Sequence, residues 1–306
     1  PVFSKSRFKS VADTLKEIPV VSAAVGPVAG LPAARFVASH FRIMTKKTSQ
    51  ILVAGPAVVE RAFGKLMTKE ELGGSKIHSQ NGVADNIAED ETDAFKQIRQ
   101  FLEFFPQNIY EIPERKLSED PINREQEELL SIVPKDRKKS YEMRDIIKYV
   151  FDEASFFEMT KFFGRGIITG FARINGYSVG ILANDSNFYA GSMSADGAKK
   201  TARFVRTCDT FNIPIVSLVD EPGFLIGPEA ESQATILYGT EAVLAVTEST
   251  VPWSTVMIRK SFGVAAAAHY GPDGYVLAWP SAESGPLPLE GGVAVAFKKE
   301  IESAKD

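Results

Sequence analysis

Two glycine-containing turns are the parts of this sequence best suited to chemistry. Gly30 follows Pro19 at the same spacing at which Gly263 follows Pro252. In each case an apolar stretch runs into the turn and an alanine-rich segment follows it. A buried strand that ends in such a turn before a short helix leaves backbone N–H groups at the helix N-terminus, where they suit a phosphate or an oxyanion. The sequence predicts two backbone oxyanion sites that could serve one cleft, across a domain or a subunit interface.

Side chains offer few competing catalytic groups. His40, His78 and His269 are too scattered for a triad or a metal site, and we interpret each as structural. The sequence has no phosphate-binding loop, dinucleotide-binding fingerprint, serine-hydrolase elbow or zinc-protease motif. Asp220 and Glu221 close a predicted buried strand, where α/β folds place ligand loops; they are either a general base or, as we favour, turn residues. Any chemistry should therefore depend on backbone donors and on a cofactor brought from elsewhere.

Composition narrows the class of protein. The 306 residues include 35 Lys and Arg against 39 Asp and Glu, with a formal net charge of −4, which excludes a generally basic nucleic-acid binder. The one cysteine, Cys208, excludes an internal disulfide framework and a cysteine-rich zinc site, and we interpret it as a small buried residue on a helix. No run of apolar residues is long enough to span a bilayer, so no membrane span is predicted.

The elements that must position the two turns alternate between strand and helix, which favours α/β architecture. Strands are predicted at residues 18–25, 41–45, 50–54, 167–174, 177–183, 213–219 and 253–258, and helices at 33–40, 56–63, 92–105, 141–151, 196–211 and 229–248. Residues 26–30 predict a tight turn, and Asn175-Gly176 a hairpin. Residues 106–139, with four prolines and many charges, predict an exposed linker.

One predicted helix has a clear apolar stripe. In residues 92–105 either Thr92 or Asp93 can cap the helix. The stripe is expected to face the core, and its members are Phe95, Ile98, Phe101, Leu102 and Phe105.

The two turns belong to an internal repeat whose period is the separation of Pro19 and Pro252. In each copy the turn is followed by a short helix with a histidine, a strand, a Gly/Pro loop and a second helix. The second copy has a predicted strand at Ile167, well before Pro252, whereas Pro19 lies close to the start of the chain. We therefore expect two copies of one large domain, the first lacking at least the counterpart of residues 167–233.

Several separated segments resemble one family, the carboxyltransferase (beta) subunit of biotin-dependent acyl-CoA carboxylases, of the propionyl-CoA carboxylase type. The segments are residues 18–31, 68–78 (TKEELGGSKIH), 204–227 (FVRTCDTFNIPIVSLVDEPGFLIG), 250–264 and 290–300. The resemblance covers essentially the whole chain. It implies α/β architecture with two tandem crotonase-like (ClpP/crotonase) domains, the first truncated at its N-terminus. We place the first domain at residues 1–118, a linker at 119–140 and the second domain at 141–306.

The resemblance implies transfer of a carboxyl group from carboxybiotin to the α-carbon of an acyl-CoA, either propionyl-CoA or a related, longer one. Biotin itself would act as the base. Backbone amides of Gly30 and Leu31 would hold the thioester oxygen, and those of Val264 and Ala265 the ureido oxygen of biotin. No metal is implied. The residues expected to bind substrate beside these amides are Ala29, Gly263, Ala267, Gly223 and Phe224.

The resemblance also implies partners. Carboxybiotin would arrive on a separate biotin carboxyl carrier subunit, and a separate biotin carboxylase would use ATP and bicarbonate. A homo-hexamer is expected, a trimer of dimers in which the two domains meet across the dimer. The expected compartment is the cytoplasm, with the mitochondrial matrix as the alternative, and neither a nucleic acid nor a membrane is expected as a partner.

Both turns depart from the family pattern. The first usually has Ala-Gly-Gly, but here Leu31 adds bulk and Pro32 has no N–H. The second usually has Gly-Gly-Ala-Tyr-Asp, but here Val264 replaces a glycine, which would tighten the biotin channel or change the backbone dihedrals. Ala267 stands where the propionyl type has an acidic residue that lines the acyl pocket. We hypothesise that it favours an acyl group other than propionyl, and a longer one.

Two alternatives stay open on the sequence. One is a biotin-dependent acyl-CoA decarboxylase subunit, which keeps the fold and reverses the reaction. The other is a non-catalytic scaffold subunit of a carboxylase complex, suggested by the two altered turns. A hydratase of the wider crotonase group is disfavoured, because residues 31–44 contain no carboxylate for acid–base work on an enoyl thioester.

Overall fold

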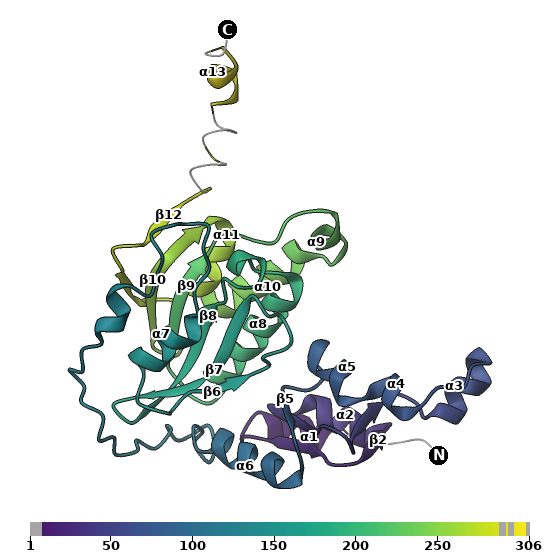
Figure 1. Ribbon diagram of the computed structural model, residues 1–306. Helices are drawn as coiled ribbons and strands as arrows, with labels where there is room; N and C mark the ends of the chain where they lie inside the picture. The colour runs from purple at the N-terminus through teal and green to yellow at the C-terminus, as the bar shows by residue number, and fades with distance from the viewer. Residues whose placement is uncertain (1–7, 288–291, 293–296, 304–306) are drawn as a thin grey trace.

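The computed structural model describes residues 8–287, 292 and 297–303, and it contains two α/β units joined by an extended segment (Figure 1). Most of the resembling segment 290–300 lies outside the described residues. The first unit contains α1 (Lys9–Leu15), β1 (Val21–Ala24), β2 (Pro27–Ala29), α2 (Leu31–Ala38), β3 (Phe41–Thr45), β4 (Gln50–Leu52), α3 (Pro56–Phe63), α4 (Lys69–Gly73), α5 (Ser75–Gln80), β5 (Asn86–Ala88) and α6 (Glu91–Leu102). Its strands form a parallel sheet β1-β3-β5 and a parallel pair β2-β4.

The second unit is built on a seven-stranded sheet with the order β11-β10-β9-β8-β7-β6, and β12 also pairs with β10. Its elements are α7 (Met143–Val150), β6 (Phe157–Met159), β7 (Ile167–Ile174), β8 (Tyr177–Asn184), η2 (Tyr189–Gly191), α8 (Ala195–Thr210), β9 (Ile215–Glu221), α9 (Pro228–Ser232), α10 (Thr235–Thr247), β10 (Trp253–Phe262), α11 (Gly263–Ala266), η3 (Ala267–His269), β11 (Tyr275–Ala278) and β12 (Glu283–Gly285). Helix α13 (Lys298–Ser303) follows.

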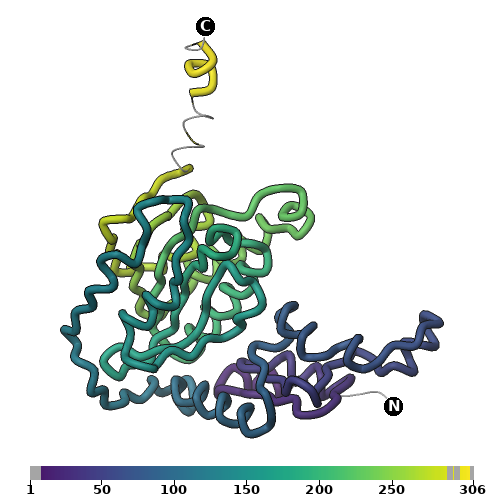
Figure 2. The backbone as a smooth tube through the Cα atoms, in the orientation of Figure 1, coloured from purple at the N-terminus to yellow at the C-terminus, as the bar shows by residue number. Residues whose placement is uncertain are grey.

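The extended segment between the units, drawn as a tube in Figure 2, contains one short 3-10 helix, η1 (Glu127–Leu130). As expected, residues 106–139 contain only a short helix, but Leu129, Ile132 and Val133 pack against the core of the second unit, so the segment is not exposed throughout. The domain limits at residues 118 and 140 stay a prediction.

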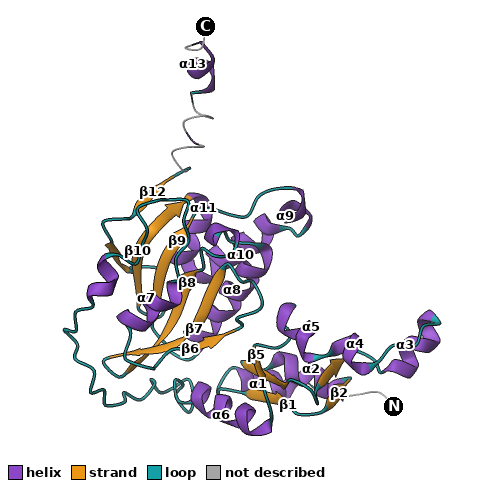
Figure 3. Cartoon of the chain, viewed as in Figure 1, coloured by secondary structure: helices purple, strands orange, loops and turns teal. Residues whose placement is uncertain are grey.

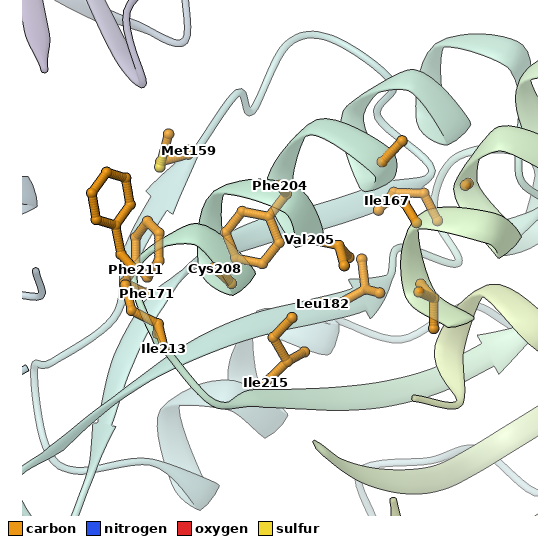
Figure 4. Close-up of a cluster of buried hydrophobic side chains, with 14 of the residues drawn as sticks. Met159, Ile167, Phe171, Leu182, Phe204, Val205, Cys208, Phe211, Ile213 and Ile215 are labelled. Atoms are coloured by element: carbon orange, nitrogen blue, oxygen red, sulfur yellow. The ribbon is translucent and has the colours of Figure 1, made fainter. Parts of the chain in front are cut away.

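Central strand β9 is buried along its whole length, because helices cover both faces of the sheet (Figure 3). Helices α8 and α10 pack on one face, and α7 packs on the other. In the close-up of Figure 4, Phe204, Val205 and Cys208 of α8 lie against strand residues that include Leu182 and Ile215. Cys208 is fully buried, as predicted.

An aromatic cluster joins the two units into one core. Phe41 of β3 stacks on Phe101 of α6 with ring centroids 4.7 Å apart, and Phe101 meets Phe171 of β7 edge-on at 5.8 Å. Phe105 contacts Phe211, which follows α8, at 5.3 Å. Such ring pairs contribute about 0.5–1.5 kcal/mol each beyond the burial of their area. The contacts hold the first unit against the sheet and α8 of the second.

The internal repeat around the two turns is confirmed by strand pairing. β1 pairs in parallel with β3 as the first part of β10 pairs with β11, and β2 pairs with β4 as the end of β10 pairs with β12. Pro27 is opposite Gln50, and their counterparts in the repeat, Lys260 and Glu283, are opposite each other. A register shift between Met257 and Ser261 divides β10 at the point where β1 and β2 are separate strands.

Some predicted elements were wrong in detail. Residues 26–30 are not simply a tight turn, because Pro27–Ala29 forms β2. The helix expected at 229–248 is broken into α9 and α10, since Ala234 adopts a left-handed conformation with φ 57°. Asp90, rather than Thr92 or Asp93, caps α6. Of the expected apolar stripe of α6, Phe95 and Leu102 are exposed.

Candidate active site

The first turn is formed where β2 runs into α2. Gly30 has φ 65° and ψ −131°, and a Cβ atom placed on it would meet nothing within 4 Å. Such a positive φ is strained for residues other than glycine. No side chain caps α2, and its first intrahelical bond runs from the Ala34 N–H to the Gly30 carbonyl at 3.0 Å. The Leu31 and Ala33 amides therefore have no intrahelical acceptor, and Pro32 between them has no N–H.

The second turn has the same backbone feature. Gly263, where β10 runs into α11, has φ 66°, and no side chain caps the helix. The amides of Val264 and Ala265 lie in its first turn, where helical N–H groups lack intrahelical acceptors. The Val264 side chain is 63% exposed, whereas Ala265 is fully buried. Ala267, at the start of η3, is exposed.

The two turns do not share a cleft within one chain. α2 lies in the first unit and α11 at the far end of the second, well separated in Figure 1. Ala29, Gly30 and Leu31 are all exposed on the first unit. Of the two arrangements that the sequence left open, a common cleft inside this chain is excluded, and a subunit interface remains.

Gly223 and Phe224 lie in the loop after β9 and are held by internal contacts. The Gly223 carbonyl accepts a hydrogen bond from the Met193 N–H at 3.2 Å. Phe224 packs against the core, and its ring covers Gly239 of α10 so closely that a Cβ there would lie 2.4 Å from a ring carbon. These contacts fix the loop beside the second turn; a role for either residue in substrate binding stays a prediction.

Asp220 is not a free general base. It is fully buried at the end of β9, and Arg259 donates to both of its carboxylate oxygens, with a shortest distance of 2.8 Å. The Lys260 N–H and the Tyr141 hydroxyl donate to it at 3.0 Å each. Because every oxygen is engaged, Asp220 anchors β9 to β10 and to the segment before α7.

Glu221 and His269 were predicted to have separate roles, and the structure places their side chains close together. His269 Nε2 lies 3.6 Å from Glu221 Oε2, and both side chains are fully buried. Burial raises the pKa of Glu221. The two residues are far apart in the sequence, so no local pattern reveals this contact, and only the predicted strand end at Glu221 was a signal. The pair lies in the second unit, beside the turn at Gly263.

A second group of charges joins the units at the end of α2 away from the first turn. Arg42 donates to Asp85 at 2.9 Å, and Arg203 of α8 also pairs with Asp85. Arg203 donates in addition to the His40 carbonyl at 2.7 Å, just after α2. Although burial alone would raise it, the two guanidinium groups hold the pKa of Asp85 well below its usual range. Burial, reinforced by the charge of Arg203, lowers the pKa of His40 to about 4.

A cationic cavity of about 200 Å³ lies between the units, with Arg42, Lys200 and Arg203 among its lining residues. Burial lowers the pKa of Lys200 to about 7. Its Nζ donates to three backbone carbonyls, those of Thr160, Phe163 and Ile167. The three carbonyls accept from all three N–H groups of the protonated amine, so Lys200 holds the segment before β7 against the start of that strand.

Among the residues that the structure describes, no group of three or more His, Cys, Asp or Glu side chains could hold a metal ion. No helix in the described part of the chain is long and apolar enough to cross a membrane.

Comparison with known proteins settles the family, since the model for the carboxyl transferase domain matches residues 6–306. The chain belongs to the carboxyl transferase domain family. The propionyl-CoA carboxylase carboxyltransferase subunit of Haloferax mediterranei is 39% identical over 294 residues, 94% of this chain and 57% of that protein. The methylmalonyl-CoA decarboxylase subunit alpha of Propionigenium modestum is 38% identical, with the same coverage.

Solved structures agree with the family. A transcarboxylase 12S structure, described as a hexamer with methylmalonyl-coenzyme A and methylmalonic acid bound, aligns with a TM-score of 0.92 and 36% identity over 98% of this chain and 58% of its own. A single-chain long-chain acyl-CoA carboxylase aligns with a TM-score of 0.84 and 28% identity over 95% of this chain and 29% of its own. The fold is α/β and crotonase-like, as predicted. The chain spans little more than half the length of the curated relatives it matches.

Proposed function

We propose that this chain carries the two oxyanion sites of a biotin-dependent acyl-CoA carboxylase, which transfers a carboxyl group from carboxybiotin to the α-carbon of an acyl-CoA. The observation that carries the proposal is the matched pair of uncapped turns. Gly30 and Gly263 share a φ near +65°, they lie at equivalent positions of the repeat, and each precedes helical amides without intrahelical acceptors. Carboxyl transfer needs two such sites, because negative charge develops on two different oxygens.

The first turn suits the thioester oxygen of the acyl-CoA. Removal of the α-proton gives an enolate whose charge rests on that oxygen, and the Leu31 and Ala33 amides are fixed donors for it. This differs by a residue from the expected pair of Gly30 and Leu31, because Gly30 is the N-cap and its position opens space for the approaching oxygen. Removing one donor of this kind lowers kcat by about 10²–10³-fold.

The second turn suits the ureido oxygen of biotin. The Val264 and Ala265 amides begin a helical segment, and no side chain caps it, so the donors are oriented before a ligand arrives. When bound, carboxybiotin supplies the CO₂ and a ureido nitrogen that accepts the α-proton. The chain's own contribution is to hold the ureido oxygen at fixed N–H donors as charge builds on it.

A complete site would form between two copies of the chain. α3 beside the first unit has no buried residue, and its Val58 and Phe63 are 61% and 80% exposed. In the second unit Ile226, Leu237 and Val264 are also exposed. These exposed apolar side chains are the ones we assign to a contact between copies. We infer that copies pair so that a first turn faces a second turn, and that the assembly is a hexamer, as named for the transcarboxylase 12S structure.

The partners and the compartment follow from the same proposal. A biotin carboxylase and a biotin carboxyl carrier subunit would supply carboxybiotin to the second turn. The compartment would be the cytoplasm, or the mitochondrion that is named for the 38% identical propionyl-CoA carboxylase beta chain of Mus musculus.

The acyl group would be longer than propionyl. Ala267 is exposed and apolar, one helical turn after Val264, so it leaves room beside the second turn. A series of acyl-CoA substrates of increasing length tests this point, and the highest kcat/KM for propionyl-CoA would contradict it.

A decarboxylase is the second candidate function. Methylmalonyl-CoA decarboxylase alpha subunits from Propionigenium modestum and Veillonella parvula are 38% and 40% identical to this chain, as similar as the carboxylase subunits. The two functions share both oxyanion sites and differ in the direction of net flux.

The experiment uses the full-length protein with free biotin and a set of carboxyacyl-CoAs, including malonyl-CoA and methylmalonyl-CoA, and it follows biotin-dependent loss of the carboxyl group. Turnover with any of them supports carboxyl transfer and ranks the acyl pocket. Net carboxylation with ATP, bicarbonate and the partner subunits then distinguishes a carboxylase from a decarboxylase. No turnover by a folded oligomer that binds CoA would favour the scaffold role.

A further inference from the structure

Three buried polar side chains form a cluster beside the second turn. Ser217 and Glu221 both belong to β9 and are separated by an even number of positions, so they point to the same face of the sheet. His269 of η3 bridges them: Nδ1 lies 2.8 Å from Ser217 Oγ, and Nε2 lies 3.6 Å from Glu221 Oε2. All three side chains are fully buried. The imidazole therefore connects the carboxyl end of β9 to the segment that carries the turn.

Glu221 holds three other parts of the second unit. Its Oε1 accepts hydrogen bonds from the N–H groups of Gly223 at 3.0 Å and Met193 at 3.3 Å. Its Oε2 accepts one from Asn184 Nδ2 at 3.0 Å. One carboxylate thus fixes the end of β8, the loop before α8 and the loop after β9, and it faces His269 as well.

His269 is also anchored through its backbone. Its carbonyl accepts hydrogen bonds from Trp253 Nε1 at 2.9 Å and from Thr255 Oγ1 at 2.7 Å, both on the strand that leads into the turn. The Val264 and Ala265 amides begin the helical stretch, α11 and η3, that ends at His269. Only Ala266, Ala267 and Ala268 separate these amides from His269, so the two ends of the stretch are closely linked.

The three hydrogen bonds that Glu221 accepts account for its carboxylate, but stability does not explain why an imidazole lies beside it. Burying a carboxylate beside an imidazole costs desolvation, and apolar side chains of similar volume often serve a core as well or better. His269 Nε2 has no hydrogen-bond partner among the described residues, and burial raises the pKa of Glu221. Both observations mark groups that are kept at an energetic cost, which is usual at functional sites.

We propose that Glu221 and His269 are positioning residues for the second turn, fixing the direction in which the Val264 and Ala265 amides point toward the ureido oxygen of biotin. Neither residue touches a substrate in this proposal, which rests on the proposed carboxyl transfer. The effect is expected on the biotin side, because the donors for the thioester oxygen lie in the other unit with different supports, and Ala267 is exposed rather than packed with the pair.

The test uses the full-length oligomer, free biotin and the best carboxyacyl-CoA. The decisive variant, E221L/H269L, removes both members of the pair, and it also leaves the Gly223 and Met193 N–H groups and Asn184 Nδ2 without the oxygen that accepts from them. We expect it to fold with an unfolding midpoint below that of H269L, which keeps those three hydrogen bonds, so the kinetic constants and not the midpoint decide the test. We expect its kcat to fall about 10- to 100-fold. The KM for biotin should rise, while the KM for the carboxyacyl-CoA should stay within about two-fold.

Two further variants sharpen the result. Glu221→Gln keeps a carbonyl oxygen for the Gly223 N–H, so it should lose less activity than Glu221→Leu. Thr201→Val is the matched control: Thr201 is a fully buried residue of α8, and its hydroxyl donates to the Gly197 carbonyl at 2.9 Å. It should reduce stability and leave both KM values and kcat unchanged.

The possible outcomes distinguish a failure of this inference from a failure of the proposed function on which it rests. Wild-type kinetics in E221L/H269L would mean that the pair only fills space, and would overturn the inference while the proposed function stands. An equal rise of both KM values, or the same kinetic loss in Thr201→Val, would indicate general loosening and would also overturn it. No turnover by the wild-type protein would overturn the proposed function, and the inference with it.

Discussion

The first and second turns share a backbone and differ in what supports it. Gly30 and Gly263 have φ values of 65° and 66°, and the strands on either side pair in the same pattern. The first turn leads into helix α2 and then His40, whose carbonyl is held by the charged cluster of Arg203 and Asp85. The second leads into the much shorter helix α11, and the stretch ends at His269 beside Glu221.

The features that the two turns share are assigned to the backbone path, and the features that differ are assigned to stability and fine position. Parallel pairing on both sides and one glycine are common to the two copies, and we assign the backbone path to them. The buried side chains nearby are different in charge and origin. They therefore set stability and fine position rather than the path itself, and each can be removed to test that division.

The largest expected effect is on the charged cluster at the end of α2, the helix that the first turn begins. Asp85→Ala leaves Arg42 and Arg203 without their buried partner, and we expect a loss of about 3–5 kcal/mol in the free energy of unfolding. Denaturant titration measures it. Asp90→Ala, which removes only the cap of α6, should cost about 1 kcal/mol. Similar losses in the two variants would contradict the importance of the charged cluster.

The second prediction concerns acid. Burial and Arg203 lower the pKa of His40 to about 4, whereas the pKa of a histidine in the unfolded chain is about 6.5. Between these values the unfolded chain binds one more proton, so stability falls as the pH drops from about 6.5 to about 4, by up to about 3 kcal/mol. In His40→Asn, where the amide oxygen can still accept from the Val20 N–H, this part of the pH dependence should disappear. Parallel stability curves for the two proteins would refute it.

Glycine replacement compares the turns directly. Gly30→Ala and Gly263→Ala each place a Cβ on a left-handed residue, at a cost of about 1–2 kcal/mol. Gly30→Ala should raise the KM for the carboxyacyl-CoA, and Gly263→Ala should raise the KM for biotin. Steady-state kinetics in both substrates checks the assignment, and the reverse pattern would mean that the turns serve the opposite ligands.

The smallest effect is expected from Val264→Gly. The side chain is 63% exposed, so removing it costs little packing, and it opens the approach to the second turn. The KM for biotin should fall by less than about ten-fold, equivalent to about 1.4 kcal/mol. Val58→Gly on α3, similarly exposed, is the control for loss of an apolar surface residue. A higher biotin KM in Val264→Gly would show that the valine assists the turn.

Much of the fold was predictable because its signals are local. The hairpin at Asn175-Gly176, buried strand β9 and the two glycines all follow from residues close in sequence. The predictions failed where distant partners decide. β2 exists only because β4 lies beside it, and Ala234 interrupts a helix although no glycine or proline marks the break.

The repeat, the α/β alternation and the position of each turn can be predicted from the sequence, because strand periodicity and a glycine in a turn depend on neighbouring residues. Tertiary structure alone decided that the two turns lie apart in one chain, and that Glu221 meets His269 and Asp85 meets Arg203. The physical reason is the same in each case. A contact between residues far apart in the chain depends on how sheets and helices pack, and no local pattern records that packing.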